Sequence, residues 1–390
     1  MSVLFSALAA LSLAAWIYLV AFRARFWRCD QRLDSGQPAP PARWPEVVAV
    51  VPARDEADVI ERSIGSLLDQ DYPGRFGVVL VDDGSGDGTG DAARRLAASH
   101  ANGARLTVVD GAQLPQGWTG KVWAMSQGVA RARDTAPAAT YLWLTDADIQ
   151  HAPGVLRALV ARAEANKLDL TSVMALLHCT SAWERLLIPA FVYFFQKLYP
   201  FPRVNDRTDA LAGAAGGCML VRRAALEAIG GIESIRAAVI DDCALARALK
   251  AKGPIWLGLS RDVRSVRPYA GLAGVWRMVA RSAYDQLGYS PLMLAGTVAG
   301  MLIVYLAPPL LALAQPWHGS ALAASLGAIA WVLMAFSYVP TLQLYRQPPV
   351  LGLLLPVAGV LYDLMTLDSA LAYYRGRGAW WKGRAQAPSP

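Results

Sequence analysis

The residues from Val3 to Phe22 carry no charged side chain, and this run is long enough to cross a bilayer as a helix. Positive charge follows it immediately, at Arg23, Arg25 and Arg28. A secretory signal peptide would carry its positive charge before the apolar stretch. Arginines after the stretch indicate a retained anchor whose following residues lie in the cytoplasm. We therefore expect residues 1–22 to form an N-terminal transmembrane anchor, with a buried soluble helix as the alternative.

Three further apolar blocks lie in the C-terminal quarter, at residues 291–314, 321–345 and 350–374. The first two have the pattern of a helical hairpin. The third contains Pro356, Asp363 and Asp368, and a full crossing there would place the basic tail, residues 375–390, outside the cell, against the positive-inside tendency. A polar segment at membrane depth is tolerated only where it is buried in protein or lines a water-filled cavity. We expect residues 291–374 to form C-terminal membrane helices, the last of them re-entrant or half inserted.

The overall composition separates this chain from both ordinary soluble enzymes and pure membrane bundles, with 55% hydrophobic and 17% charged residues. Its formal net charge of +7 fits a surface that rests on anionic lipid and binds a phosphorylated substrate. The sequence lacks the ladder of basic and aromatic residues that nucleic-acid binding needs, so we expect no nucleic-acid partner. Its four cysteines have neither paired metal spacing nor a disulfide framework.

The segment at residues 46–267 alternates between strand-like and helix-like patterns, and follows a basic and Pro-rich linker at residues 23–45. The expected strands are, in chain order, VVAVVP, FGVVLVDD, RLTVVDG and TYLWLTDAD. A continuous β-branched run such as the first is typical of a strand buried on both faces. Strands that alternate with helices imply a mostly parallel sheet with right-handed crossovers, so the fold class is α/β. Ligands of such sheets bind beyond the carboxyl ends of the strands.

Charged residues end three of these strands: Arg54, Asp55 and Glu56; Asp82 and Asp83; Asp146 and Asp148. Side chains two apart in an extended chain point to the same side, so Asp146 and Asp148 would repel each other unless a cation lies between them. Hard divalent cations favour carboxylate oxygens and bridge to phosphates. Asp also commonly ends strands and caps helices. Three acidic clusters converging on one edge nevertheless favour a metal–nucleotide site holding Mg²⁺ or Mn²⁺.

The motifs VVPARDE, VVLVDDGSGDGT, TDAD and VIDDCALARAL occur in the order seen in membrane-bound family 2 glycosyltransferases, which this chain resembles over about residues 46–252. A more specific resemblance, to the hopene-associated glycosyltransferases of bacterial hopanoid gene clusters, rests on LPQGWTGKVWAMSQG, AAGGCMLVRRAALEAIGGI and the terminal WWKGR. The resemblance implies a Rossmann-like A-type glycosyltransferase domain. It also implies a nucleotide-sugar donor, expected to be UDP-linked, and a lipid acceptor such as a hopanoid.

The resemblance also implies roles for single residues. Pro52, Arg54 and Glu56 would line the nucleotide, whereas Asp55 stands where relatives often have Asn, which leaves its contact open. Asp83 would hold the uracil or ribose.

On the diphosphate side, the resemblance implies that Asp148 binds the metal and that Asp146 assists it. Lys121 lies in TGK at an expected helix start, where a cation and free N–H groups favour phosphate; an ordinary surface lysine is the alternative. Asp242, the second acidic residue of VIDD, would be the catalytic base, and Asp241 would lie beside it. Both could instead simply cap the helix.

One departure from the family concerns its processive members, which carry a Gln-x-x-Arg-Trp motif near the membrane. Arg281 is the nearest equivalent here and no Trp follows it, which favours a single transfer. We place Arg281, Lys382 and Arg384 together with Asp241 on the acceptor or diphosphate side.

The apolar and aromatic segment at residues 183–203 is expected to lie on the bilayer beside the site, with a core helix as the alternative. Residues 268–290 form an expected juxtamembrane amphipathic segment. The sequence therefore predicts an inverting, multi-pass glycosyltransferase of the bacterial inner membrane whose catalytic domain faces the cytoplasm. Two alternatives stay open: a polyisoprenyl-phosphate glycosyltransferase, and a non-enzymatic scaffold with a degenerate transferase domain.

Overall fold

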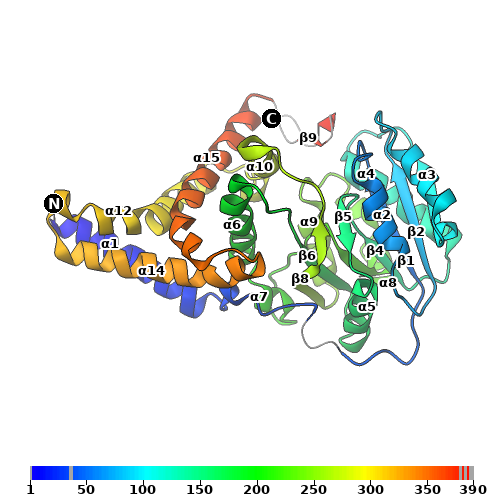
Figure 1. Ribbon diagram of the computed structural model, residues 1–390, viewed down its shortest axis with the longest axis horizontal. Coiled ribbons are helices and arrows are strands. Elements are labelled where there is room, and N and C mark those ends of the chain that lie inside the picture. Colours follow the sequence, from blue (N-terminus) through cyan, green and yellow to red (C-terminus); the bar gives the residue numbers. More distant parts are fainter. Residues whose placement is uncertain (1, 35–37, 377–379, 382–383, 386–390) are drawn as a thin grey trace.

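The computed structural model describes residues 2–34, 38–376, 380–381 and 384–385. It consists of an α/β domain and a region of long helices (Figure 1). The domain is built on one eight-stranded sheet with the order β3-β2-β1-β4-β7-β6-β8-β5. Its strands are β1 (Val47–Ala53), β2 (Phe76–Asp82), β3 (Leu106–Asp110), β4 (Tyr141–Leu144), β5 (Ile149–His151), β6 (Leu170–Leu176), β7 (Met219–Arg222) and β8 (Ile255–Ser265). A separate antiparallel pair joins β9 (Trp380–Trp381) and β10 (Arg384–Ala385).

The strands that end at the predicted acidic clusters are parallel to one another. Val47 of β1 lies opposite Phe76 of β2 and Tyr141 of β4, and β2 pairs in parallel with β3. Strand β7 runs antiparallel to both β4 and β6, and β5 runs antiparallel to β8. The prediction of a Rossmann-like, mostly parallel sheet is confirmed, with two antiparallel strands added.

Helices cover both faces of the sheet because its strands are apolar on both sides. In β1, Val48 and Val50 join one core cluster, whereas Val47, Ala49 and Val51 join the other. Helices α2 (Ile60–Leu68), α3 (Thr89–Ser99) and α5 (Val155–Ala165) contribute to the second cluster. The first cluster is built with α4 (Gly120–Thr135), α7 (Phe201–Asn205), α8 (Arg223–Ala228) and α9 (Asp241–Lys250). Two short 3₁₀ turns, η3 (Gly103–Arg105) and η4 (Ile232–Ile235), connect these elements.

The sequence prediction placed Asp146 and Asp148 in one extended strand, and this is wrong. Strand β4 ends at Leu144, Asp146 lies in the following loop, and Asp148 lies in a turn before β5. The reason is that β5 pairs with β8 rather than continuing β4. The two carboxylates are therefore neighbours through a turn and not through strand alternation.

Part of the linker at residues 23–45 is built into the domain. Arg32 forms a parallel bridge to Leu259 of β8, and Leu33 is buried in the second core cluster. Closer to the first helix, η2 (Phe26–Arg28) buries Phe26. The linker thus ties the N-terminal helix to the sheet as well as spacing them.

Four segments are long and apolar enough to cross a membrane: Ser2–Phe22, Pro291–Leu313, Ala321–Leu344 and Pro349–Tyr374. They comprise α1 (Ser2–Ile17) with the π-turn η1 (Tyr18–Phe22); α11 (Pro291–Met301), the π-turn η6 (Leu302–Leu306) and α12 (Ala307–Leu313); α14 (Ala321–Leu344); and η7 (Pro349–Leu354) with α15 (Leu355–Tyr374). The short α13 (Gln315–His318) turns the expected hairpin between α12 and α14. Trp16 of α1 donates to the carbonyl of Val304 in η6 at 2.7 Å, which joins the first segment to the second.

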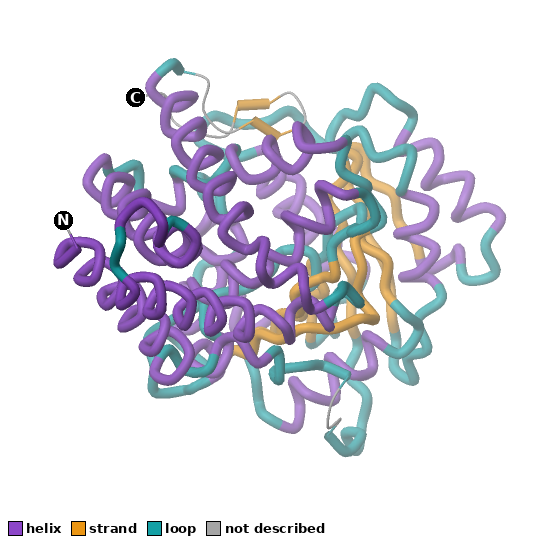
Figure 2. Tube along the Cα trace, turned by 60° about the vertical axis from the view of Figure 1, so that its left-hand side comes forward, coloured by secondary structure: helices purple, strands orange, loops and turns teal. Residues whose placement is uncertain are grey.

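The last apolar segment differs in direction from the others. Helices α1, α12 and α14 pack along one another, whereas α15 packs mainly against η6, α10, α11 and α6. In Figure 1 α15 runs across the ends of the α1–α14 pair and not beside it, and Figure 2 shows the same group of helices from another side. A re-entrant or half-inserted last block stays a prediction.

Helix α6 (Ala182–Leu198) lies between the domain and these helices, together with α10 (Gly271–Ala280) and the turn η5 (Asp285–Leu287). A capping box starts it, in which Ser181 accepts from Glu184 N and the Glu184 carboxylate accepts from Ser181 N. Most of its side chains are buried, including Tyr193 and Phe194. The core-helix alternative therefore describes its body, and exposed apolar side chains are confined to its ends, at Trp183 and Leu198.

Candidate functional site

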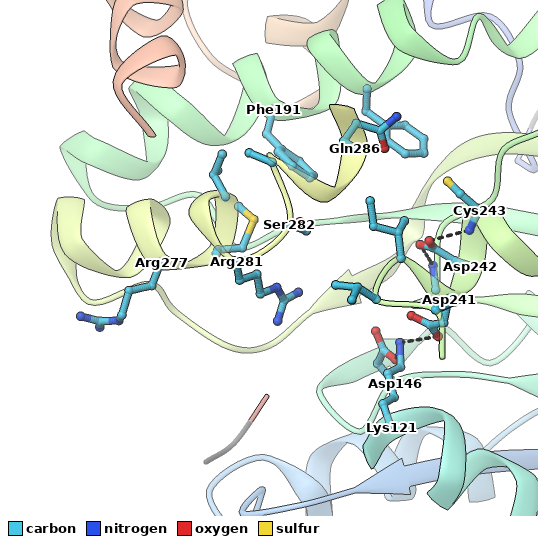
Figure 3. Close-up of a pocket in the computed structure, with 18 of the residues that line it drawn as sticks. Lys121, Asp146, Phe191, Asp241, Asp242, Cys243, Arg277, Arg281, Ser282 and Gln286 are labelled. Atoms are coloured by element: carbon cyan, nitrogen blue, oxygen red, sulfur yellow. Dashed lines mark hydrogen bonds and ion pairs between the residues drawn. The ribbon is translucent and has the colours of Figure 1, made fainter. Parts of the chain in front are cut away.

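The carboxyl ends of β1 and β4 and the first turns of α4 and α9 surround one cavity of about 760 Å³. Figure 3 shows Lys121, Asp146, Asp241 and Asp242 converging on it from these elements. The cavity continues past them to side chains of α6, α10, α11 and α15. It therefore has a charged end at the sheet and an aromatic end among the helices.

Lys121 is the central cation of the charged end. Its Nζ lies 2.8 Å from Asp146 Oδ1 and 3.2 Å from Asp241 Oδ2, and its side chain is 18% exposed. Burial alone would lower the pKa of Lys121, but the two carboxylates outweigh it and hold the pKa above its usual range. The alternative of an ordinary surface lysine is therefore wrong. Because Lys121 is the second residue of α4, the helix start predicted from TGK places it correctly.

Asp242 is held by two backbone donors. Gly216 N donates to Oδ2 at 2.8 Å and Cys243 N donates to Oδ1 at 2.7 Å, so both oxygens are fixed in place. Burial and then the neighbouring Asp241 raise the pKa of Asp242 to about 6. A Cβ on Gly216 would lie 3.1 Å from Lys121 Nζ and 3.4 Å from Asp242 Oδ2, so this close approach favours glycine. A carboxylate poised in this way is suited to accept a proton near neutral pH.

Asp148 faces a group that the sequence analysis missed, Arg267. Ser265 donates to Asp148 Oδ2 at 3.2 Å, and Arg267 Nε lies 3.7 Å from the same oxygen. Arg267 also forms an ion pair with Glu56, which is 8% exposed. Burial and the nearby Asp146 raise the pKa of Asp148 to about 6. An arginine two residues after the end of a long strand, as in RSVRPYAG, was the available signal for this residue.

The loops after β1 and β2 are joined by side chains predicted to line the nucleotide. Arg54 donates to the carbonyls of Asp83 and Gly84, and its guanidinium lies 4.0 Å from Asp83 Oδ2. Asp82 accepts from Ser85 N at 3.1 Å and so fixes the Gly-rich turn. Pro52 and Glu56 line the cavity, whereas Arg54 and Asp83 do not.

A buried hydrogen-bond relay lies behind the charged end and was also missed. The Thr145 hydroxyl donates to Gly217 O at 2.7 Å and lies 3.0 Å from His151 Nε2. Burial lowers the pKa of His151 to about 3, so its ring is neutral and carries its proton on Nε2 to donate to Thr145. This relay connects the loop of Asp146 to the loop whose Gly216 N–H holds Asp242.

The described residues contain no group of three or more His, Cys, Asp and Glu side chains that would form a complete metal cage. Asp148 and Asp146 nevertheless fit Mg²⁺ or Mn²⁺, because such ions are commonly held by one or two carboxylates together with substrate phosphates. The donor set is all oxygen, as hard cations prefer.

The aromatic end of the cavity is formed by helices. Phe191, Phe194 and Tyr199 line it, with Tyr362 from α15. Arg277 and Arg281 of the α10 segment are exposed and also line the cavity; Figure 3 shows Arg281 directed toward its interior.

Two further residues were expected on this side, at the C-terminus. Lys382 lies outside the described residues. Arg384 belongs to β10, and its side chain is not described.

Comparison with known proteins finds a solved glycosyltransferase with a similar fold. Residues 48–230 match the model of the family described as glycosyl transferase family 2. A mannosyltransferase from Pyrobaculum calidifontis, solved with GDP-Man and Mn²⁺, is similar at TM-score 0.54 and 22% identity, covering 94% of this chain and 98% of that one. The S. aureus protein TarS, residues 1–349 with UDP-GlcNAc, gives TM-score 0.40 and 14% identity over 75% of this chain and 91% of that one. Among curated proteins, no relative matches.

Proposed function

We propose that this chain, whose residues 48–230 form a glycosyltransferase family 2 domain, moves a sugar from a nucleotide-sugar onto a hydroxyl group of a membrane lipid. The observation that carries the proposal is the continuity of one cavity. The same cavity is lined by Asp242 at the sheet and by Thr297, Tyr362 and Thr366 of helices apolar enough to lie in a membrane. A lipid held among these helices can therefore present its head to Asp242.

The donor would bind at the charged end. Pro52 and Glu56 line this end of the cavity and would contact the nucleotide, and Asp83 is the expected partner of its base or ribose. Contact with Asp83 requires Arg54 to shift, because Asp83 is only 1% exposed beside the guanidinium. The expected donor is UDP-linked, but the similar mannosyltransferase was solved with GDP-Man, so both nucleotides belong in the test.

The transfer needs one base and one stabilised leaving group. Asp242 takes the proton from the acceptor hydroxyl as its oxygen forms a bond to the anomeric carbon, and the bond from that carbon to the diphosphate breaks. Attack from the face opposite the diphosphate inverts the anomeric centre. Asp148, with Asp146, would hold a Mg²⁺ or Mn²⁺ ion, which would stabilise the charge that develops on the diphosphate. Lys121 positions Asp146 and Asp241 around this centre.

The charge around Asp242 favours a neutral hydroxyl over a phosphate acceptor. Asp146, Asp241 and Asp242 share one buried cation, Lys121, and burial strengthens repulsion between like charges. A polyisoprenyl phosphate would bring further negative charge to this point and would not need a base. The hopanoid acceptor is proposed from the resemblance of the motifs alone. The scaffold alternative is not favoured, because the carboxylates at positions 148 and 242 are both in place.

The proposed topology puts the domain in the cytoplasm of a bacterial inner membrane, where nucleotide-sugars are made. It follows from the arginines after Phe22 and from the apolar segments. Cysteines introduced singly between Arg23 and Trp44 should be protected from an impermeant maleimide in intact cells. External labelling there would overturn this topology.

The function is tested by combining each of several sugar donors with each of several acceptor lipids. Purified protein is incubated with UDP- and GDP-linked sugars and with phosphatidylethanolamine–phosphatidylglycerol vesicles that carry a hopanoid polyol, ceramide or polyisoprenyl phosphate. Products are identified by mass spectrometry. We expect a glycosylated hydroxyl lipid; donor turnover without any lipid product would contradict the proposal.

A further inference from the structure

The cavity has an exposed edge between the end of α6 and α11. Leu198, the last residue of α6, lines the cavity and is 47% exposed. Tyr199 and Gln286 hydrogen-bond through hydroxyl and side-chain amide at 2.9–3.0 Å, which holds η5 beside the end of α6. Thr297 of α11 also lines the cavity, and Nζ of Lys197, the neighbour of Leu198, lies 3.8 Å from Sδ of Met301 in α11. The exposed Leu198 therefore lies where the cavity passes beside a helix that is expected to lie in lipid.

Helix α11 is the least packed of the apolar helices. None of its residues from Pro291 to Met301 is buried, whereas α14 buries side chains along its length. Cβ atoms on Gly296 and Gly300 would meet open space. Few packing contacts mean that a small displacement of this helix costs little.

The two ends of α11 have backbone that can accommodate such a displacement. Before it, Gly288 and Tyr289 both have positive φ, at 60° and 55°. After it, the chain forms the π-turn η6 in place of regular α-helix. Such π-turns occur mostly as local insertions within α-helices and frequently at functional sites.

We propose that the gap between Leu198 and Thr297 is the lateral route by which the acceptor lipid reaches Asp242. This inference rests on the proposed function and adds the path and the chemical class of the head group. The walls change along the path: Leu198 and Leu287 are apolar and suit the hydrocarbon, whereas Ser282, Gln286 and Thr297 offer hydroxyl and amide groups. These hydroxyl and amide groups suit a neutral alcohol head, whereas Arg277 and Arg281, which also line the cavity, would favour a phosphate head, and the vesicle assay of the proposed function compares the two. The hydrocarbon remains between α6 and α11 while the hydroxyl lies at the sheet.

The experiment narrows the gap without touching the charged end. Leu198→Trp and Thr297→Trp place a large ring at the two sides of the route. Leu292→Trp is the matched control, because Leu292 lies on the same helix, is 81% exposed and does not line the cavity. The full chain in phosphatidylethanolamine–phosphatidylglycerol vesicles is assayed for transfer to a hopanoid polyol and to ceramide. Without acceptor, it is assayed for hydrolysis of the donor, measured as released nucleoside diphosphate.

We expect both route variants to lose transfer by at least about ten-fold, as steric exclusion from an apolar pocket does, while donor hydrolysis stays at the wild-type rate. A short-chain, water-soluble alcohol should still accept sugar in both, and Leu198→Ala should transfer at least as fast as the wild type.

Wild-type lipid transfer in both Trp variants would overturn the route, as would a loss of hydrolysis equal to the loss of transfer. A wild-type protein that hydrolyses donor but glycosylates neither lipid contradicts the proposed function itself, before any variant is compared.

Discussion

The two ends of the cavity are held together by different forces. At the sheet, Lys121 in the first turn of α4 pairs with Asp146 in the loop after β4 and with Asp241 at the start of α9, so the charged end depends on half-buried ion pairs. At the helices, Phe194 makes edge contacts to Tyr305 and Tyr362 at ring-centroid distances of 5.3 and 5.0 Å, so the other end depends on aromatic packing. We therefore expect substitutions at the charged end to alter the turnover rate and its pH dependence. Substitutions among the helices should instead alter how well the acceptor lipid is used.

The largest effect should come from Asp242→Asn. The amide cannot accept the proton, so turnover should fall by about 10²–10⁴-fold. It keeps one of the two backbone hydrogen bonds, to Gly216 or Cys243. Because burial raises the pKa of Asp242 to about 6, the folded state loses stability as the pH rises from the ordinary carboxyl range to about 6. Above that pH the loss is complete, so removing the charge offsets part of the lost bond.

Transfer rates and thermal melts of Asp242→Asn at pH 7.5 check this prediction. Asp241→Asn is the control and should keep more activity. Near-normal turnover of Asp242→Asn on a hydroxyl acceptor would show that the base has been assigned to the wrong carboxylate.

The second effect concerns Lys121→Met, which leaves Asp146 and Asp241 facing each other. Removing one partner of a fully buried ion pair typically costs ~3–5 kcal/mol, and the partial exposure of Asp146, whose side chain is 33% exposed, should reduce this cost. For the same reason, added salt should screen part of the remaining repulsion between the two carboxylates and restore part of this stability. Denaturant unfolding in detergent measures it, and Lys121→Met combined with Asp146→Asn should recover a large part. A variant as stable as the wild type would mean that this ion-pair cluster does not hold the charged end together.

The third effect is a pH dependence of the charged end. Asp242 must be ionised to act as base, and its pKa is raised to about 6 by burial and then by Asp241. Turnover at saturating donor and cation should therefore fall about ten-fold per pH unit below pH 6. Asp241→Asn removes the neighbouring charge and should move this fall to lower pH. A profile unchanged by Asp241→Asn would contradict the assignment of the titrating group.

The smallest effect should come from Thr145→Val, which acts through hydrogen bonds behind the site. It removes the donor to Gly217 O and the acceptor for His151 Nε2. Unpaired buried groups cost about 1–3 kcal/mol of stability. The loop that holds Asp242 should loosen, lowering kcat several-fold with little change in KM for the donor. Thr145→Ser keeps the hydroxyl and should restore kcat; equal loss in both variants would point to packing instead.

The charged end could be predicted from sequence more fully than the helical end. Apolar β-branched runs predicted the strands, and the acidic residues after them predicted the edge of the sheet at which the cavity lies. The starts of α4 and α9 were also predicted, which placed Lys121 and Asp242 correctly. The turn that carries Asp148 was not, because β5 is short and pairs with a strand more than a hundred residues later.

Residues whose roles depend on contacts with distant parts of the chain were hard to predict from the sequence. Arg267 meets Asp148 because β5, which directly follows Asp148, pairs with β8, which ends two residues before Arg267. Helix α6 looked like a surface helix because aromatic residues are common both at bilayer interfaces and in cores. Only the packing of α10 and α15 against it shows that its body is buried.

The most direct test of the account is a competition between the two kinds of acceptor in one vesicle. Wild-type protein and Asp242→Asn receive donor and divalent cation with equal amounts of a hopanoid polyol and a polyisoprenyl phosphate, and both products are quantified by mass spectrometry. The account predicts that wild type glycosylates the hydroxyl lipid, with inverted anomeric configuration, and that Asp242→Asn loses this product. Preferential formation of a polyisoprenyl-phosphate sugar, undiminished in Asp242→Asn, would contradict it.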